Sequence, residues 1–150
     1  YKIASVTSAS KTKDPKGDKI LCNELMSRDA ETFVSLGFSD LETFEYKKFK
    51  NVKFLFCVPK YPTSLFDADL KKMPKLFNEE KNSYYGFSDH ALGTSAALLA
   101  FFRGASILEK HFTMGNFRQA ETEKAHLCSF TPETLNEFKN KIIELNMLVN

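Results

Sequence analysis

The segment YGFSDHALGTSAALLAFFRGASILEKHFTMG, residues 85–115, contains two of the three histidines of the chain. His90 follows one short apolar run and His111 lies near the end of another, and both runs have the composition of buried strands. The stretch Thr94–Arg103 between them is rich in Ala, Leu and Phe, and Gly104 stands where a glycine commonly ends a helix. The segment therefore predicts a strand, a nearly fully buried helix and a second, parallel strand, with a histidine at the end of each strand.

The same alternation of strand and helix extends over the rest of the chain. The predicted strands are residues 2–5, 19–22, 52–58, 84–88 and 105–112. Ser39–Glu42 has the pattern of a capping box, and Thr131–Glu133 opens a last helix that runs to about Leu148. This pattern predicts an α/β fold with a parallel sheet, in one domain that spans residues 1–150.

Composition excludes several classes of protein. Lys and Arg number 21 against 19 for Asp and Glu, so the net charge of +2 does not indicate a nucleic-acid or anionic-membrane surface. The three cysteines lack Cys-x-x-Cys spacing, which favours reduced thiols and a cytoplasmic location. The longest apolar run, AALLAFF, is far shorter than the roughly 20 residues of a membrane span. Because Tyr1 is not a methionine and a strand pattern begins at once, we expect a fragment or a processed segment.

Several polar side chains fall at the predicted carboxyl ends of strands, where the ligand sites of β/α folds lie. They are Lys2, Ser5, Asn23, Tyr61, Ser88, His90 and His111. Two neutral imidazoles on neighbouring strands suit a divalent transition metal, and a lysine with nearby hydroxyls suits a phosphate or a carboxylate. Asp89 and Glu109 are expected to hold the histidine tautomers. Spacing alone also fits hydrogen-bonded loop histidines, so it does not decide between the two interpretations.

The residues of these motifs and their order resemble those of the sialic acid synthase family. In that family an S-D-H motif after the seventh barrel strand and an E-K/R-H-F-T motif after the eighth supply two metal-binding histidines, and this chain has YGFSDHALG followed by GASILEKHFT. YKIAS resembles the fourth strand, DKILCNELMS the fifth and KFLFCVPKYPT the sixth, and TPETL resembles the start of the eighth helix. The resemblance implies a partial (β/α)₈ TIM barrel, about strands four to eight, without the first three strands or the family's C-terminal antifreeze-like domain.

The resemblance also implies an activity. The family condenses phosphoenolpyruvate with an N-acetylated amino sugar such as N-acetylmannosamine, which gives a nine-carbon 2-keto acid and phosphate. His90 and His111 match its ligands for Mn²⁺ or Mg²⁺, and the intact protein is expected to be a homodimer. Tyr61 matches a sugar-contacting tyrosine, and Asn23 stands where a serine commonly contacts phosphate. The residues that match phosphoenolpyruvate contacts are Lys2, Ser5 and Ser88.

Departures from the family pattern leave alternatives open. The chain has Ser5-Val6-Thr7 in place of S-G-E, Pro59 in place of a common asparagine, and RQAETEKAH, with Ala125, in place of P-G-P-D-H. These changes question the identity of the substrate more than the class of reaction. One alternative is a related barrel that acts on another aldehyde. Another is a non-catalytic scaffold or interaction segment, and the isolated piece is not expected to be a complete catalyst.

Overall fold

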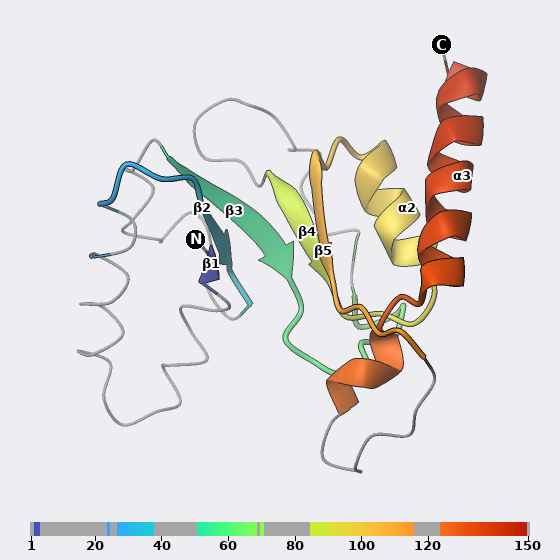
Figure 1. Cartoon of the computed structure of the whole chain (residues 1–150), viewed down its shortest axis with the longest axis horizontal. Helices are drawn as coiled ribbons and strands as arrows, with labels where there is room; N and C mark the ends of the chain where they lie inside the picture. The colour runs from blue at the N-terminus through green and yellow to red at the C-terminus, as the bar shows by residue number, and fades with distance from the viewer. Residues whose placement is uncertain are drawn as a thin grey trace.

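The computed structural model describes residues 2–3, 24, 27–37, 51–68, 70, 85–115 and 124–149. Five strands, two α-helices and one 3₁₀-helix, η2, are formed by these residues (Figure 1). In chain order they are β1 (Lys2–Ile3), β2 (Thr32–Ser35), β3 (Val52–Cys57), β4 (Gly86–Asp89), α2 (Ser95–Phe102), β5 (Ile107–Lys110), η2 (Lys124–Cys128) and α3 (Pro132–Val149).

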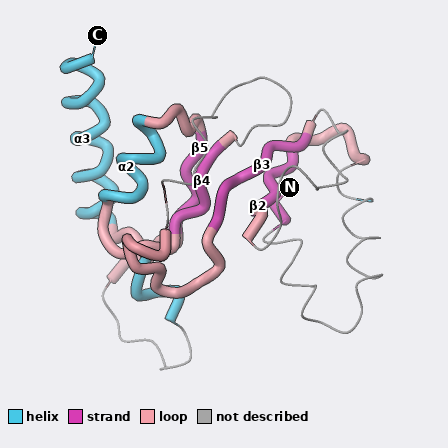
Figure 2. The backbone as a smooth tube through the Cα atoms, turned by 180° about the vertical axis from the view of Figure 1, so that it is seen from behind, coloured by secondary structure: helices cyan, strands magenta, loops and turns pink. Residues whose placement is uncertain are grey.

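The strands form one parallel sheet in the order β1-β2-β3-β4-β5. Strands that are sequential along the chain are thus neighbours in the sheet, as in consecutive β/α units of a barrel. Helix α2 lies next to β4 and β5, and α3 stands beside α2, on the side away from these strands (Figures 1 and 2). The predicted α/β fold of a partial barrel is therefore confirmed. Of the helices that the structure describes, none is both long and apolar enough to span a membrane.

The second strand of the sheet is not the one predicted from the sequence. The strand that pairs with both β1 and β3 is Thr32–Ser35, whereas residues 19–22, the predicted strand, lie outside the described residues. Val34 and Ser35 are fully buried, so this strand belongs to the core. The sequence analysis did not predict a strand at Thr32–Ser35, because a four-residue run is too short for its hydrophobic pattern to identify a strand. The predicted capping box at Ser39–Glu42 also lies outside the described residues.

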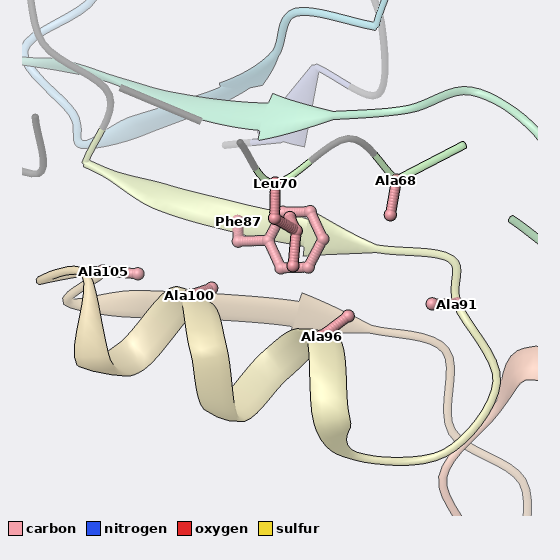
Figure 3. Close-up of a cluster of buried hydrophobic side chains, with 7 residues drawn as sticks. All are labelled: Ala68, Leu70, Phe87, Ala91, Ala96, Ala100 and Ala105. Atoms are coloured by element: carbon pink, nitrogen blue, oxygen red, sulfur yellow. The ribbon is translucent and has the colours of Figure 1, made fainter. Parts of the chain in front are cut away.

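The core beside the functional edge of the sheet is built on Phe87 of β4. Phe87 is 2% exposed and packs in a cluster whose other buried members are Ala68, Leu70, Ala91, Ala96, Ala100 and Ala105 (Figure 3). Small side chains on α2 let the helix approach the strand closely, and Phe87 fills the space that remains. Because side chains alternate across a strand, Ser88 points to the face of the sheet opposite Phe87.

The two helices are less covered than their apolar sequences indicate. In α2 only Ala96, Ala97 and Ala100 are buried, while Leu99 is 41% and Phe102 is 45% exposed, so the prediction of a nearly fully buried helix was wrong. The predicted start of the last helix is confirmed, since Thr131 Oγ1 accepts a hydrogen bond from the Thr134 N–H at 3.3 Å. Such a cap supplies a partner for one of the free N–H groups of the first turn.

Gly86 is required where β4 meets β5. A Cβ atom at this position would lie 2.3 Å from the Ile107 carbonyl oxygen and 2.8 Å from the Ile107 Cβ. We therefore expect Gly86→Ala to push the two strands apart and to lower the free energy of unfolding by about 1–3 kcal/mol. Chemical denaturation measures this change. Asn140→Ala, at an exposed position of α3, serves as the control and is expected to stay within about 0.5 kcal/mol of wild type. Equal stability of the two variants would contradict the tight approach at Gly86.

Candidate metal centre

The loops after β3, β4 and β5 bring three aromatic side chains together at the carboxyl edge of the sheet. The rings of His90 and His111 have centroids 6.0 Å apart, and the ring of Tyr61 lies 4.0 Å from His90 and 5.6 Å from His111. Of the seven residues predicted from the sequence, these three are thus placed in one cluster. The parallel pairing of β4 with β5 causes this arrangement, because it sets the ends of the two strands side by side.

Backbone hydrogen bonds hold the loops that carry the cluster. The Thr63 N–H donates to the His90 carbonyl at 2.8 Å, which ties the loop after β3 to the end of β4. The Phe130 N–H donates to the His111 carbonyl, also at 2.8 Å, which ties the segment after η2 to the end of β5. Both histidines are therefore held through their own main chain as well as by their strands.

The side chain of His90 is oriented by a main-chain carbonyl. His90 is 6% exposed, and its Nδ1 lies 2.8 Å from the Val58 oxygen. A carbonyl only accepts hydrogen bonds, so Nδ1 carries the proton and the lone pair of the neutral ring is on Nε2. Metal-binding histidines commonly donate their other N–H to a carbonyl in this way. The Cys57 sulfur also lies near this nitrogen, at 3.8 Å.

Both histidines are in an environment that favours the neutral imidazole. Burial lowers the pKa of His90, and it also lowers the pKa of His111, to which the neighbouring His126 adds a second, smaller lowering effect. A neutral imidazole is the form that binds a metal ion. The electrostatics of the cluster therefore agree with a ligand role for both rings.

Asp89 and Glu109 have partners other than the Nδ1 of His90, although the sequence led us to expect them to hold the tautomers. Asp89 Oδ2 accepts a hydrogen bond from Lys110 Nζ at 2.7 Å, and Glu109 Oε1 accepts one from the Ser88 hydroxyl at 2.6 Å. For His90 the Val58 carbonyl has the role that we assigned to Asp89, so that prediction was wrong. A main-chain acceptor cannot be recognised from residue type, which explains the error.

Tyr61 closes one side of the cluster with a neutral phenol. Tyr61 is 37% exposed. Burial of the remainder, with smaller contributions from Cys57, Cys128 and Glu109, raises the pKa of Tyr61 to about 12. The hydroxyl therefore keeps its proton at neutral pH and is available as a hydrogen-bond donor.

His126 is a residue of the cluster that the sequence analysis did not select. It lies in η2, and its ring centroid is 6.2 Å from that of His111. The segment that follows η2 pairs with the residues after β5 through the bridge between Phe112 and Phe130, and this bridge brings η2 to the site. The only signal in the sequence was the presence of a third histidine after the second motif.

The other predicted residues are described in part or not at all. Ser88 is buried in β4, on the same face as Glu109, and the backbone of Lys2 is in β1. Ser5 and Asn23 lie outside the described residues. Asn23 was selected because it follows the predicted strand at 19–22. The strand in that place of the sheet is β2, and the side chain at its carboxyl end is Ser35, which is fully buried.

The separation of the two histidine rings is compatible with ligation of one divalent ion. An ion about 2.1 Å from a ligating nitrogen lies on the order of 3 Å from the ring centre, so two centroids 6.0 Å apart are within reach of one ion. Within the described part of the chain no group of three or more His, Cys, Asp or Glu residues has the geometry of a metal site. A two-histidine site leaves several coordination positions for oxygen atoms of a substrate.

The fold and this pair define a domain of the β/α-barrel class with a candidate metal centre at the carboxyl ends of its strands. The model of the NeuB family matches residues 1–149, and the chain belongs to that family. The resemblance to sialic acid synthases that the sequence motifs indicated is thereby confirmed.

Named relatives and a solved structure agree with this assignment. The chain is 31% identical over 134 residues to the pseudaminic acid synthase of Campylobacter jejuni, which covers 85% of this chain and 36% of the relative. It is 40% identical over 88 residues to the N,N'-diacetyllegionaminic acid synthase of Legionella pneumophila, over 59% of this chain and 23% of the relative. The N-acetylneuraminic acid synthetase of Leptospira borgpetersenii superposes with a TM-score of 0.75 at 26% identity and covers 99% of this chain and 50% of that protein. The chain thus spans about a third of the length of the first relative and half of the structural neighbour.

The lowered histidine pKa values predict how stability depends on pH. The unfolded chain binds protons at its histidines below about pH 6.5, whereas folded His90 and His111 resist protonation. Their contribution to stability is therefore present above about pH 6.5 and is lost as the pH falls through the lower, folded values. We compare the free energy of unfolding of metal-free protein at about pH 7.5 and at about pH 5. We expect it to fall less with pH in His90→Gln and in His111→Gln than in wild type. Urea denaturation at each pH, with a chelator, measures this difference; parallel curves would contradict the burial effect.

Proposed function

We propose that the protein is a sugar-acid synthase that condenses phosphoenolpyruvate with an N-acetylated amino sugar in its open-chain aldehyde form. The observation that carries the proposal is the pair of neutral histidines at the ends of β4 and β5, 6.0 Å apart between ring centroids. The names of the relatives, which are synthases of pseudaminic, legionaminic and sialic acids, support the same class of reaction.

In this proposal His90 and His111 hold one Mn²⁺ or Mg²⁺ ion. When bound, the ion supplies Lewis-acid polarisation of the aldehyde, which makes the carbonyl carbon more electrophilic. The contribution of the protein is orientation: the Val58 carbonyl fixes the ring of His90 so that Nε2 is available as the ligand atom. Tyr61 packs on that ring, and we assign to it a hydrogen bond from its hydroxyl to a sugar oxygen.

The reaction balances without a further reagent. C3 of phosphoenolpyruvate forms the new bond to the aldehyde carbon, and water adds at C2. One proton of this water goes to the former aldehyde oxygen. The C2–O bond to the phosphate group then breaks, the second proton goes to the departing phosphate, and the water oxygen becomes the carbonyl oxygen of the 2-keto acid. The enzyme needs to exclude other nucleophiles and to hold the two substrates in contact, which is the main work of a site of this kind.

The proposal also assigns residues to the contacts with phosphoenolpyruvate. Lys2, Ser5 and Ser88 are proposed to bind its phosphate and carboxylate, as the resemblance implies. The Ser88 proton points to Glu109 in the free protein, so this hydroxyl must turn when it donates to the substrate. In the family a serine after the fifth barrel strand commonly contacts phosphate. We propose that Ser35, rather than Asn23, has this role here, because β2 is the strand in that place of the sheet.

The proposal extends to the whole protein rather than to this segment alone. We propose a cytoplasmic homodimer in which further strands complete the barrel. This agrees with the short share of the relatives that the chain spans. The five parallel strands that the described residues form have two edges, and closing a sheet into a barrel removes such edges.

Loss of either histidine is expected to abolish the reaction. In the complete protein with Mn²⁺, phosphate release from phosphoenolpyruvate should require an N-acetylated amino sugar. His90→Ala and His111→Ala should each lower kcat/KM by more than about 100-fold, since each removes a ligand. A colorimetric phosphate assay with a panel of such sugars measures this rate.

The control is Asn140→Ala, on the exposed surface of α3, which should keep the wild-type rate. If folded wild-type protein that binds Mn²⁺ releases no phosphate with any sugar, the synthase proposal fails. A related barrel with another aldehyde substrate, or a non-catalytic role, would then be the better interpretation.

Tyr61→Phe tests the proposed sugar contact separately. The variant keeps the ring that packs on His90 but lacks the hydroxyl. We expect KM for the sugar to rise by about 3–10-fold, the equivalent of one neutral hydrogen bond, with no change in Mn²⁺ affinity. Steady-state kinetics and a Mn²⁺ titration give the two values. An unchanged KM would remove Tyr61 from the sugar site.

A further inference from the structure

Asp89 and Lys110 form a buried ion pair at the ends of the two strands that lead into the histidines. Lys110 Nζ is 2.7 Å from Asp89 Oδ2, and the two side chains are 4% and 0% exposed. Each other described ion pair has one partner with more than half of its side chain exposed, so this pair alone among them is removed from water. Asp89 directly precedes His90, and Lys110 directly precedes His111.

The pair connects the two chain segments that carry the histidines. Lys110 Nζ also donates to the Ala91 carbonyl at 2.7 Å, and Asp89 Oδ1 accepts the Ala91 N–H at 2.8 Å. The residue after His90 is thus bonded at both its N–H and its C=O to the two members of the pair. These bonds fix the main chain on both sides of His90 relative to the end of β5.

The contacts of Lys110 extend to the main chain of His111. Its ammonium lies 4.8 Å from the centre of the Phe130 ring, in a cation–π arrangement. The Phe130 N–H in turn donates to the His111 carbonyl at 2.8 Å. One ammonium group therefore contacts the segments that follow both histidines.

Stability alone does not account for a pair buried in this way. Removing two charges from water is costly, and well-packed apolar residues in place of such a pair are often neutral or stabilising. Because side chains alternate along a strand, Asp89 and Lys110 point to the face opposite Ser88 and Glu109. They are consequently unable to act as ligands at the site themselves. What the pair does provide is a directional link between two strand ends, and each of these ends continues into a histidine.

We propose that Asp89 and Lys110 are positioning residues that set the separation and orientation of His90 and His111, and thereby the affinity of the site for a divalent ion. The proposal rests on the metal centre proposed above. Asp89 and Lys110 are the middle residues of the S-D-H and E-K-H motifs. In this proposal they neither bind the metal ion nor contact the substrate.

The test is Co²⁺ binding by the complete protein, since the visible absorption of Co²⁺ reports its ligand geometry. Three variants are compared with wild type: Asp89→Asn, Lys110→Met and the double variant that combines them. We expect the Co²⁺ dissociation constant to rise by about 10–100-fold in each, the range typical of residues that support metal ligands. We also expect the absorption bands to shift. The double variant leaves no unpaired buried charge, so its unfolding midpoint should recover relative to Lys110→Met.

The matched control is the exposed pair on α3, in which Glu137→Gln and Lys141→Met likewise replace the acid by its amide and the lysine by methionine. This control should bind Co²⁺ as wild type does. A folded double variant with the wild-type dissociation constant and spectrum would overturn the proposal. If the double variant does not fold, Asp89→Asn decides, because it keeps the shape of the side chain and its acceptor for the Ala91 N–H.

Failure of the metal centre itself gives a different result. In that case wild-type protein binds no Co²⁺, or His90→Ala retains it, whatever the Asp89 and Lys110 variants do. Wild-type binding that His90→Ala abolishes, together with unchanged binding in the Asp89 and Lys110 variants, rejects the positioning role alone.

Discussion

The parallel pairing of β4 with β5 is the constraint on which the site depends. In this register Asp89 lies opposite Lys110, so the next residue along each strand is a histidine at the same edge of the sheet. Gly86 allows the strands to approach, and Phe87 with the small residues of α2 fixes β4 from the other face (Figure 3). Catalysis by the two histidines requires that this edge holds them in place, and the contacts on both faces of the sheet support it.

Much of this edge was predictable from the sequence. A strand, an Ala-rich helix and a second strand had clear boundaries, because Gly104 marks the end of the helix and continuous apolar runs mark the strands. Tyr61, His90 and His111 were predicted to converge, and the structure places their rings within 4.0–6.0 Å of one another. Strand order alone was enough for this result, since parallel neighbours share their carboxyl edge.

Other parts depended on information that residue types do not contain. The strand at Thr32–Ser35 was not predicted, since a four-residue run is too short for its hydrophobic pattern to identify a strand. The Val58 carbonyl holds His90, and main-chain groups carry no sequence signal. The partner of Asp89 was also misassigned, because the face to which a strand residue points and its neighbour across the sheet follow only from the register. His126 reaches the site through a bridge between Phe112 and Phe130 that no local pattern indicates.

The central claim is that His90 and His111 bind the same ion. Pulsed EPR of Mn²⁺ bound to the complete protein tests it most directly, because it detects imidazole nitrogens coordinated to the metal. We expect one Mn²⁺ per chain with two coordinated imidazoles, and loss of one of them with strongly weakened binding in His90→Ala or His111→Ala. A tightly bound Mn²⁺ without imidazole coupling, or with a coupling that both variants keep, would contradict it.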